Sequence, residues 1–307
     1  MANNNDIGVI VKRRTHHMRG LGDITDDELP PITELTVLNS RHREGEPNPE
    51  HKPLSSRIGS CENLITLRLF GCSSIPPDIV GCTKLSKLYL HSRSGNDDND
   101  CRIELPEGVN FPNLNYVNIR GSGNWNTNEI MSWLVVSCPN LHGLYFYDLT
   151  KDTANHFMGS LQNNEAFVGQ IRHTLHHISF DNCNLNEDDL RSFLFDIKPL
   201  YRRLSTINLR NNNIESIETI GKAIRELLPA NNNPLLPSNL RSLYLKGNSF
   251  TRNLNNPESS DHTAMIDLLK YHPFLCRIGS YTDETITYLP KIDYWLMMNR
   301  SKLRYLL

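Results

Sequence analysis

Apolar residues recur at fixed spacings in short segments along this chain, and several segments share one pattern. Segments that begin at Leu175, Leu204 and Leu240 carry apolar residues at offsets 0, 3 and 5, asparagine or cysteine at offset 8 and an apolar residue at offset 10. Successive side chains of a strand point to opposite faces, so offsets 3 and 5 share one face and offset 4 lies on the other. Each segment therefore predicts a short strand that buries offsets 3 and 5.

Further copies of the segment are present with a weaker signature. The copy from Leu64 has cysteine at offset 8 and its closing aliphatic residue one position late. Copies from Leu85, Leu114, Leu141 and Leu275 have lost the signature at offset 8. One segment cannot cover its own apolar face, so neighbouring copies must stack. The pattern predicts a repeat domain whose strands lie side by side.

Helices are expected between the later strands, because the apolar spacing there changes to i, i+3, i+4 and i+7. The first of these stripes follows Asn186, a residue type that is typical of an N-cap. The stripes are Leu190, Phe193, Leu194 and Ile197; Ile217, Ile220, Ile224 and Leu228; and, earlier, Ile130, Trp133 and Leu134. They are interpreted as helix faces buried against the sheet.

Offset 8 is expected to hold buried side chains that pair with backbone groups in the turn after each strand. The residues at this structural position are Cys72, Cys183, Asn212 and Asn248. A buried carboxamide can both donate and accept, and each backbone group left unpaired would cost about 1–3 kcal/mol. Asn211 and Asn213, which flank Asn212, are expected to face solvent and to have no structural role.

The repeated pattern L-x-x-L-x-L-x-x-N/C-x-L resembles the motif of the leucine-rich-repeat family. The resemblance extends from about Cys61 to the C-terminus. It implies an α/β solenoid with a curved parallel sheet on the concave face and helices and irregular turns on the convex face. The short first interval resembles the short Pro-containing repeats of the family, and the later intervals resemble its ribonuclease-inhibitor-like and cysteine-containing repeats.

The resemblance and the pattern together predict that the chain has three parts. Residues 1–58 form a polar N-terminal segment and linker whose fold is undecided; the segment from Ile32 resembles a degraded copy but is not counted as a repeat. Residues 59–290 form a solenoid of about eight repeats. Residues 291–307 form a capping helix, which is similar to the ending of uncharacterised leucine-rich-repeat proteins of unicellular algae, with Asn299 and Arg300 in place but Lys302 where a glycine would stand.

Composition narrows the classes of partner. The chain of 307 residues has 32 basic and 34 acidic residues and a net charge of -2, which argues against binding nucleic acid or membrane through overall charge. It has no apolar run long enough for a membrane span and no secretory signal. Its seven cysteines include no Cys-x-x-Cys pair and fit a reducing compartment. These observations predict an intracellular protein, in the cytoplasm or the nucleus.

No sequence signature of catalysis, cofactor binding or metal binding is found. Cys61 and Cys82, like Cys138, stand three residues before the first leucine of a repeat and are interpreted as small core residues. His176 and His177 are adjacent, so they point to different sides of a strand, and together with His173 they are interpreted as surface residues. The chain is therefore predicted not to be an enzyme and to hold no cofactor.

The outward strand positions are the candidate site. They are Arg68, Tyr89, Asn118, Tyr145, Ser179, Asn208 and Tyr244 at offset 4, and Phe70, His91, Arg120, Tyr147, Asp181, Arg210 and Lys246 at offset 6. Tyrosine and arginine are common in protein interfaces. Arg68, Arg120, Arg210 and Lys246 face a single acid, so the protein partner is expected to present acidic groups. The alternative is that tyrosine stands there for its β-propensity and the cations only keep the sheet soluble.

Three functions are compatible with this pattern. The first is a non-enzymatic scaffold that binds a protein on the concave face. The second is a substrate adaptor of a ubiquitin ligase, because the segment from Cys61 to Ile75 resembles repeats of F-box proteins; this requires a helical N-terminal module. The third is a regulator of GTP hydrolysis, because the helix-bearing repeats resemble those of Ran-type GTPase activators. Fold alone does not choose among them.

Overall fold

The computed structural model describes residues 8–11, 18–19, 32–38, 56–71, 74–92, 103–123, 125–163, 169, 173–196, 203–226, 239–272, 275–278 and 290–304. The chain divides into two compact units, Met1–Leu141 and His142–Leu307. Each unit is an ordered stack of repeats.

Unit one contains a sheet whose strands follow the chain order from β3 to β6. The strands are β1 (Gly8–Val11), β2 (Met18–Arg19), β3 (Glu34–Leu38), β4 (Thr66–Phe70), β5 (Lys87–His91) and β6 (Tyr116–Arg120). Neighbours from β3 to β6 are parallel, whereas β1 pairs antiparallel with both β2 and β3. The connections hold the 3-10 helices η2 (Ser56–Ser60) and η3 (Pro77–Gly81), and helix α1 (Thr127–Ser137) follows β6.

The strand register of unit one aligns the predicted offsets. Leu35 pairs with Leu67, which pairs with Leu88, and all three side chains are buried. β3 therefore belongs to the same series as β4, with Ile32 buried at offset 0. The sequence indicated this copy only weakly, because it lacks an asparagine or cysteine at offset 8. Parallel pairing in register buries the apolar face of each repeat against its neighbours.

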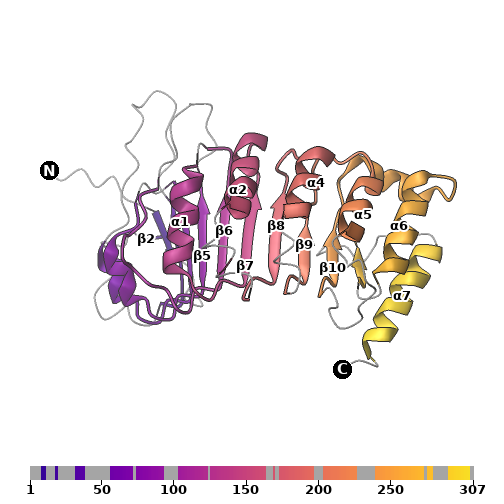
Figure 1. Cartoon of the computed structure of the whole chain (residues 1–307). Helices are drawn as coiled ribbons and strands as arrows, with labels where there is room; N and C mark the ends of the chain where they lie inside the picture. Colours follow the sequence, from indigo (N-terminus) through magenta and orange to yellow (C-terminus); the bar gives the residue numbers. More distant parts are fainter. Residues whose placement is uncertain are drawn as a thin grey trace. The chain divides into compact units, whose positions relative to one another are not determined.

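Unit two repeats a strand, a turn and a helix. Its strands are β7 (Gly143–Tyr147), β8 (His177–Asp181), β9 (Thr206–Asn208), β10 (Ser242–Tyr244) and β11 (Arg277–Ile278), and the neighbours are parallel. Its helices are α2 (Lys151–Asn163), α4 (Glu187–Asp196), α5 (Ile217–Glu226), α6 (Ser260–Tyr271) and α7 (Pro290–Arg304), with the 3-10 helix η5 (Ser249–Asn255) before α6. Figure 1 shows α2, α4, α5 and α6 in a row that follows the order of their strands.

Aromatic side chains fill the space between sheet and helices in unit two. The ring of Phe146 lies 4.7 Å from that of Phe180 on the next strand and 4.5 Å from that of Phe157 on α2. Phe180 contacts Phe193 of α4 edge to face at 5.2 Å. All four rings are fully buried. Such rings contribute both buried apolar area and specific stacking geometry.

The predicted fold is confirmed: each unit is an α/β leucine-rich-repeat arrangement with parallel strands on one side and helices or turns on the other. The stripes of α1 and α4 are buried at Trp133, Leu190 and Phe193. The predicted core positions Ile197 and Leu228 lie outside the described residues.

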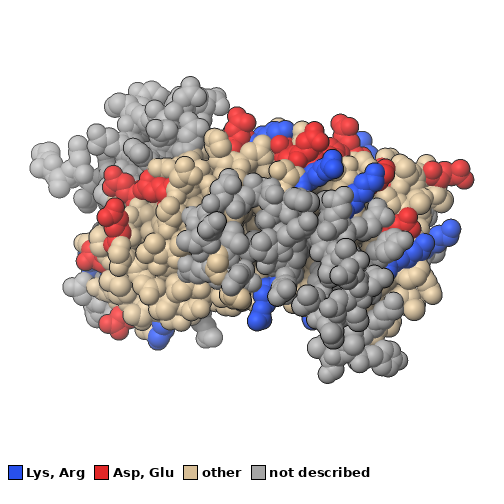
Figure 2. Space-filling view, in the orientation of Figure 1, with Lys and Arg blue, Asp and Glu red and all other residues tan. Residues whose placement is uncertain are grey.

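The helices of unit two begin with acidic residues. The first turn of α4 contains Glu187, Asp188 and Asp189, and negative charge there is favoured by the helix dipole. Figure 2 shows acidic side chains gathered along the upper edge of the view, over α2 and α4. Asp189 accepts a hydrogen bond from the Asn186 backbone N–H at 2.9 Å, while the Asn186 side chain caps the Asp189 N–H at 3.1 Å.

Asp189 also joins two helices. Lys151 Nζ lies 2.8 Å from its carboxylate, and Asn155 of α2 donates to it at 3.0 Å. Burial raises the pKa of this carboxyl, but the hydrogen bonds from Asn186, Lys151 and Asn155 outweigh burial and lower it overall. The carboxylate is thus held in its charged form between α2 and α4.

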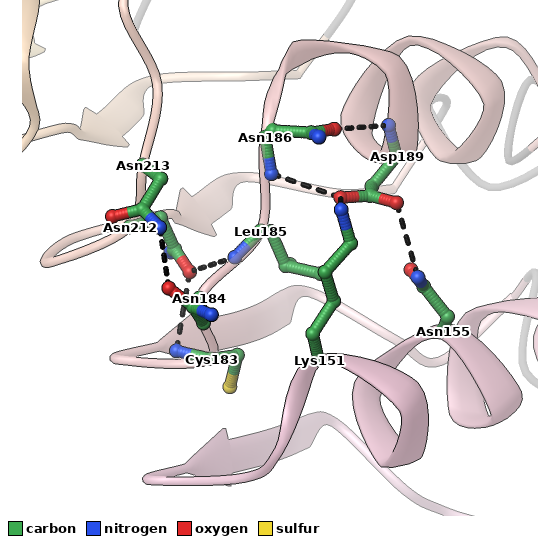
Figure 3. A network of polar contacts seen from close by, with 9 residues as sticks. All are labelled: Lys151, Asn155, Cys183, Asn184, Leu185, Asn186, Asp189, Asn212 and Asn213. Atoms are coloured by element: carbon green, nitrogen blue, oxygen red, sulfur yellow. Dashed lines mark hydrogen bonds and ion pairs between the residues drawn. The ribbon is translucent and has the colours of Figure 1, made fainter.

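The Asn212 carboxamide connects two consecutive repeats, as Figure 3 shows. Its Oδ1 accepts from the N–H groups of Cys183 and Leu185, both at 3.1 Å. Its Nδ2 donates to the carbonyls of Phe180 at 2.7 Å and Arg210 at 3.0 Å. The side chain is 4% exposed. All four hydrogen-bonding positions of the amide are therefore used in a place that water hardly reaches.

The other residues at offset 8 follow the same principle. Asn248 accepts from the Ile214 N–H at 3.2 Å and donates to the carbonyls of Leu209 and Leu245. Cys183 is buried, its thiol donates to Phe146 O at 3.8 Å, and burial raises the pKa of that thiol to about 12. Cys72 lies outside the described residues.

The expectation that Asn211 and Asn213 have no structural role is wrong. Both are exposed, but Asn211 has a positive φ of 55° and its amide donates to Asp181 Oδ1 at 2.8 Å. Asn213 donates to Asn184 in the preceding repeat. Positive φ also occurs at offset 7 in other repeats, at Gly71, Gly121, Asp148, Asn182 and Gly247. The turn requires a left-handed residue there, which glycine, asparagine and aspartate adopt most readily.

The cysteines before the repeats are core residues. Cys61, Cys82 and Cys138 are at most 2% exposed. Burial raises the pKa of Cys61 to about 11 and of Cys82 to about 12, and it raises that of Cys138 further still. These thiols stay protonated and unreactive at neutral pH.

Helix α7 lies at the end of unit two. Asn299 is fully buried, and its Nδ2 lies 2.9 to 3.1 Å from the carbonyl oxygens of Leu269, His272 and Leu275. Arg300 donates through Nε to Cys276 O at 3.0 Å. The carboxamide thus pairs with carbonyl groups of the last repeat, as the amides at offset 8 do in the repeats before it.

We expect Asn212→Ala to lower the free energy of unfolding by about 3 kcal/mol or more, because two N–H and two C=O groups lose their partner. The exposed Asn213→Ala should stay within about 0.5 kcal/mol of the wild type. Equilibrium denaturation in urea measures both. Equal effects of the two substitutions would contradict the role given to the buried amide.

Gly247→Ala should destabilise the protein by about 1–3 kcal/mol, because its φ is 84° and a Cβ there would collide with Asn211 Oδ1. The control is Gly159→Ala in α2, where a Cβ meets nothing within 4 Å. That change should be neutral or stabilising by about 0.5–1 kcal/mol. Thermal and chemical denaturation compare the pair, and a neutral Gly247→Ala would argue against a strained turn.

Candidate protein-binding surface

The side of each sheet opposite the buried leucines is here termed the open face. It carries offsets 2, 4 and 6, and the register of unit one places these side chains in rows across the strands. The rows are Glu34, Thr66, Lys87 and Tyr116; Thr36, Arg68, Tyr89 and Asn118; and Phe70, His91 and Arg120. Neighbours in a row are about 4.8 Å apart, so they can contact directly.

Rings gather on the open face of unit one. The rings of Phe70 and His91 lie 4.2 Å apart, Tyr89 lies 6.3 Å from His91, and Tyr89 lies 5.2 Å from Tyr116. All four residues are half-buried. We term them the aromatic cluster. The sequence prediction missed Tyr116 because it considered offsets 4 and 6, although offset 2 points to the same face.

Arg68 is not unpaired, contrary to the sequence prediction. Its guanidinium forms an ion pair with Glu34 of β3 and lies 4.6 Å from the centre of the Tyr89 ring. Glu34 was missed because the repeat that contains it has a weak signature. Neutralised by this carboxylate and stacked on an aromatic face, Arg68 is less available to an acidic partner than the sequence suggested.

Tyr145 and Tyr147 form a second aromatic surface, on β7 of unit two. Their rings lie 6.4 Å apart and are nearly parallel, at 3°. Both are half-buried. A Cβ on Gly143 would collide with the Tyr145 ring, so the glycine makes room for the ring to lie along the strand. Large, partly exposed rings held in place by their surroundings are typical binding groups.

The prediction that all outward positions are accessible is wrong. Asn118, Asp181, Asn208 and Tyr244 are between 4% and 7% exposed, and Ser179 is fully buried. In unit two the physical reason is a polar network across neighbouring strands. Asn208 Nδ2 donates to Ser179 Oγ at 2.9 Å and to Asp181 Oδ2 at 3.2 Å, and Asn208 Oδ1 accepts from the Arg210 N–H at 3.1 Å. These side chains satisfy each other instead of facing a partner.

Arg120 is exposed, whereas Arg210 and Lys246 are half-buried. The Nε of Arg210 is buried and has no hydrogen-bond partner within the described part of the chain. The acid across from it, Asp181, receives amide hydrogen bonds from Asn208 and Asn211 instead.

The histidines at the start of β8 are only partly on the surface. His173 is exposed, but His176 and His177 are half-buried, which corrects the sequence interpretation. His176 stacks on His142 at 5.5 Å and 7°. Burial lowers the pKa of His177, and the neighbouring His176 and His142 lower it further. Among the described residues, no group of three or more His, Cys, Asp or Glu is arranged to hold a metal ion.

Comparisons with known proteins show similarity in structure only. No protein-family model matches the chain, and no curated protein matches it. The C-terminal domain of tropomodulin from Caenorhabditis elegans is 12% identical with a TM-score of 0.40, covering 59% of this chain and 96% of that one. Actin-binding site 2 of leiomodin-1 is 17% identical with a TM-score of 0.38, covering 58% and 91%. These scores are low, so the interpretation of the surface rests on this chain's own residues.

Within the described ranges, no helix combines the length and the apolar character that crossing a bilayer requires.

His177 generates a pH prediction. Because its pKa in the folded protein is below the ordinary value of 6.5, the folded state disfavours its protonation. The neutral His177 side chain therefore contributes fully to the free energy of unfolding above pH 6.5, and this contribution is lost as the pH falls below 6.5. His177→Gln should reduce the acid-induced loss of unfolding free energy, measured by urea denaturation on both sides of 6.5. An equal loss in variant and wild type would exclude this role.

Proposed function

We propose that this protein is a non-enzymatic protein-binding module or scaffold whose open face contacts a protein partner. The observation that carries the proposal is the pair of partly exposed aromatic surfaces, the aromatic cluster in unit one and Tyr145 with Tyr147 in unit two. Tyrosine combines a large apolar area with few rotatable bonds, so it loses little entropy when it is buried in an interface.

The charges on the open face support a partner with acidic groups. Arg120 is exposed at the end of β6, and Arg210 has a buried Nε without an acceptor. A carboxylate of the partner placed near Arg210 would supply the missing acceptor, and charge-assisted bonds of this kind are the stronger ones. Arg68 does not add to this argument because Glu34 already neutralises it.

The adaptor alternative receives no support from the described N-terminal residues. It requires a helical module, whereas the described elements before residue 39 are the strands β1, β2 and β3. No arrangement among the described residues favours the GTPase regulator.

We expect the double change Tyr145→Ala with Tyr147→Ala to weaken partner binding by about thirtyfold or more, since truncated interface hot spots typically cost about 2 kcal/mol or more. The partner is obtained by affinity capture with the wild type and then purified for a direct measurement of the dissociation constant. Circular dichroism and thermal unfolding verify that the variant is folded.

The control is Val136→Ala on α1, where the side chain is 69% exposed and lies on the opposite side of the repeat from the open face. It should bind as the wild type does. If the control weakens binding and the tyrosine variant does not, the helical side is the binding surface and the proposal fails.

A further inference from the structure

Asn118 of β6 is a buried amide with an unused acceptor. Its side chain is 7% exposed, and its Oδ1 is fully buried without a hydrogen-bond partner among the described residues. Buried polar atoms are nearly always paired, because an unpaired one loses its hydration without compensation. The unpaired Oδ1 of Asn118 stands in a surface row of the sheet, which points to a hydrogen-bond donor that another molecule supplies.

Asn208 provides an internal comparison, because it occupies the same offset in its own repeat. Its Oδ1 accepts from the Arg210 N–H, and its Nδ2 donates to Ser179 and Asp181. The same residue type at the same position is therefore satisfied within the chain in unit two. Offset 4 does not by itself leave an asparagine without a partner, so the unused oxygen of Asn118 reflects its particular surroundings.

Those surroundings are aromatic. The register places Asn118 directly beside Tyr89, and Tyr116 lies two residues before it on the same face of β6. The two tyrosine rings lie 5.2 Å apart. A group that donates a hydrogen bond to Asn118 would therefore lie beside two half-buried rings, which can cover an apolar or aromatic side chain next to that donor.

The charges on the open face of unit one indicate which charged residues the bound segment should carry. The eleven positions of the three rows contain the cations Arg68, Lys87 and Arg120 and one acid, Glu34. Glu34 pairs with Arg68, and the other two charged residues of these rows, Lys87 and Arg120, are both cations. Both of these residues are exposed. Charge complementarity thus favours acidic residues in a segment that covers the rings.

We infer that the open face of unit one binds an extended segment of a partner protein through the Asn118 carboxamide. Because Oδ1 is covered in the free protein, the Asn118 carboxamide turns toward the segment on binding and accepts a hydrogen bond from a backbone N–H of the segment. An aromatic or apolar side chain next to that N–H covers Tyr89 and Tyr116, and acidic residues on either side approach Lys87 and Arg120. This inference rests on the proposed function, because it specifies the partner segment for the same open face.

Removing the polar group of Asn118 should have opposite effects on stability and on binding. In the free protein, leucine at position 118 has nearly the shape of asparagine but no unpaired oxygen, so Asn118→Leu should raise Tm. Asn208→Leu, the matched substitution, should lower Tm because it breaks an occupied network. A residue with a purely structural role would not gain stability when its polar group is removed.

The binding test uses a phage-displayed library of short random peptides selected on the wild-type protein. We expect selected peptides with an aromatic or apolar residue flanked by Asp or Glu. They should bind Asn118→Leu about tenfold more weakly, the cost of one lost hydrogen bond at an interface. Asn115→Leu, an exposed change on the turn before the same strand, should bind them as the wild type does.

The possible results separate the two proposals. Peptides that bind the wild type and Asn118→Leu equally, but lose affinity on Tyr145→Ala with Tyr147→Ala, overturn the Asn118 site and leave the open face as the binding surface. Peptides indifferent to both changes contradict the inference and the proposed function together. A fall of Tm in Asn118→Leu similar to that in Asn208→Leu overturns the inference, because the amide would then be a structural group.

Discussion

The buried amides at offset 8, Asn212 and Asn248, are the interaction on which the stacking of the repeats from Leu175, Leu204 and Leu240 depends. A strand that turns sharply toward a helix leaves backbone N–H and C=O groups that neither element pairs, and a buried pair of such groups is costly. The Asn212 side chain pairs these groups, because it accepts two hydrogen bonds and donates two to backbone groups of two consecutive repeats. The amide works only if the neighbouring repeat is in register, so it fixes the stacking as well as the turn. The left-handed residue before it, Asn211, lets the chain reach that geometry.

The proposed binding surface follows from the same constraint. Once the register is fixed, offsets 3 and 5 are committed to the core, and offsets 2, 4 and 6 form continuous rows on the other face. The two units differ in which side chains fill these rows and in how the polar groups among them are hydrogen-bonded. In unit two the centre of the rows is a closed polar network of Ser179, Asp181 and Asn208. In unit one the rows hold rings and one amide oxygen without a partner. The same backbone therefore supports a polar network on the open face of unit two and a set of rings beside an unpaired amide oxygen on that of unit one.

The sequence predicted the strands β4 to β11, the buried faces of α1, α4 and α5 and the leucine-rich-repeat fold, because these depend on spacing within one repeat. It did not predict β1, β2, α2 or α6. It could not predict features that depend on the residue beside a given position in the next repeat. Arg68 was expected to be free because Glu34 stands in a copy without the signature residue. Asn208 was expected to face a partner because its bonds to Ser179 and Asp181 become visible only when strands are aligned laterally. Asn211 was judged incidental because backbone dihedrals do not show in a hydrophobic pattern. Tyr116, by contrast, could have been found by extending the same alternation to offset 2.

A protein partner is proposed to contact the open face and not the helices. Site-specific photo-crosslinking tests it most directly, with a photoreactive phenylalanine derivative in place of Tyr147 on β7 or, for comparison, in place of the exposed Asp188 on α4. Illumination in the presence of the purified partner should give a covalent adduct from position 147 and none from position 188. An adduct from position 188 alone would place the contact on the helical side and contradict the account.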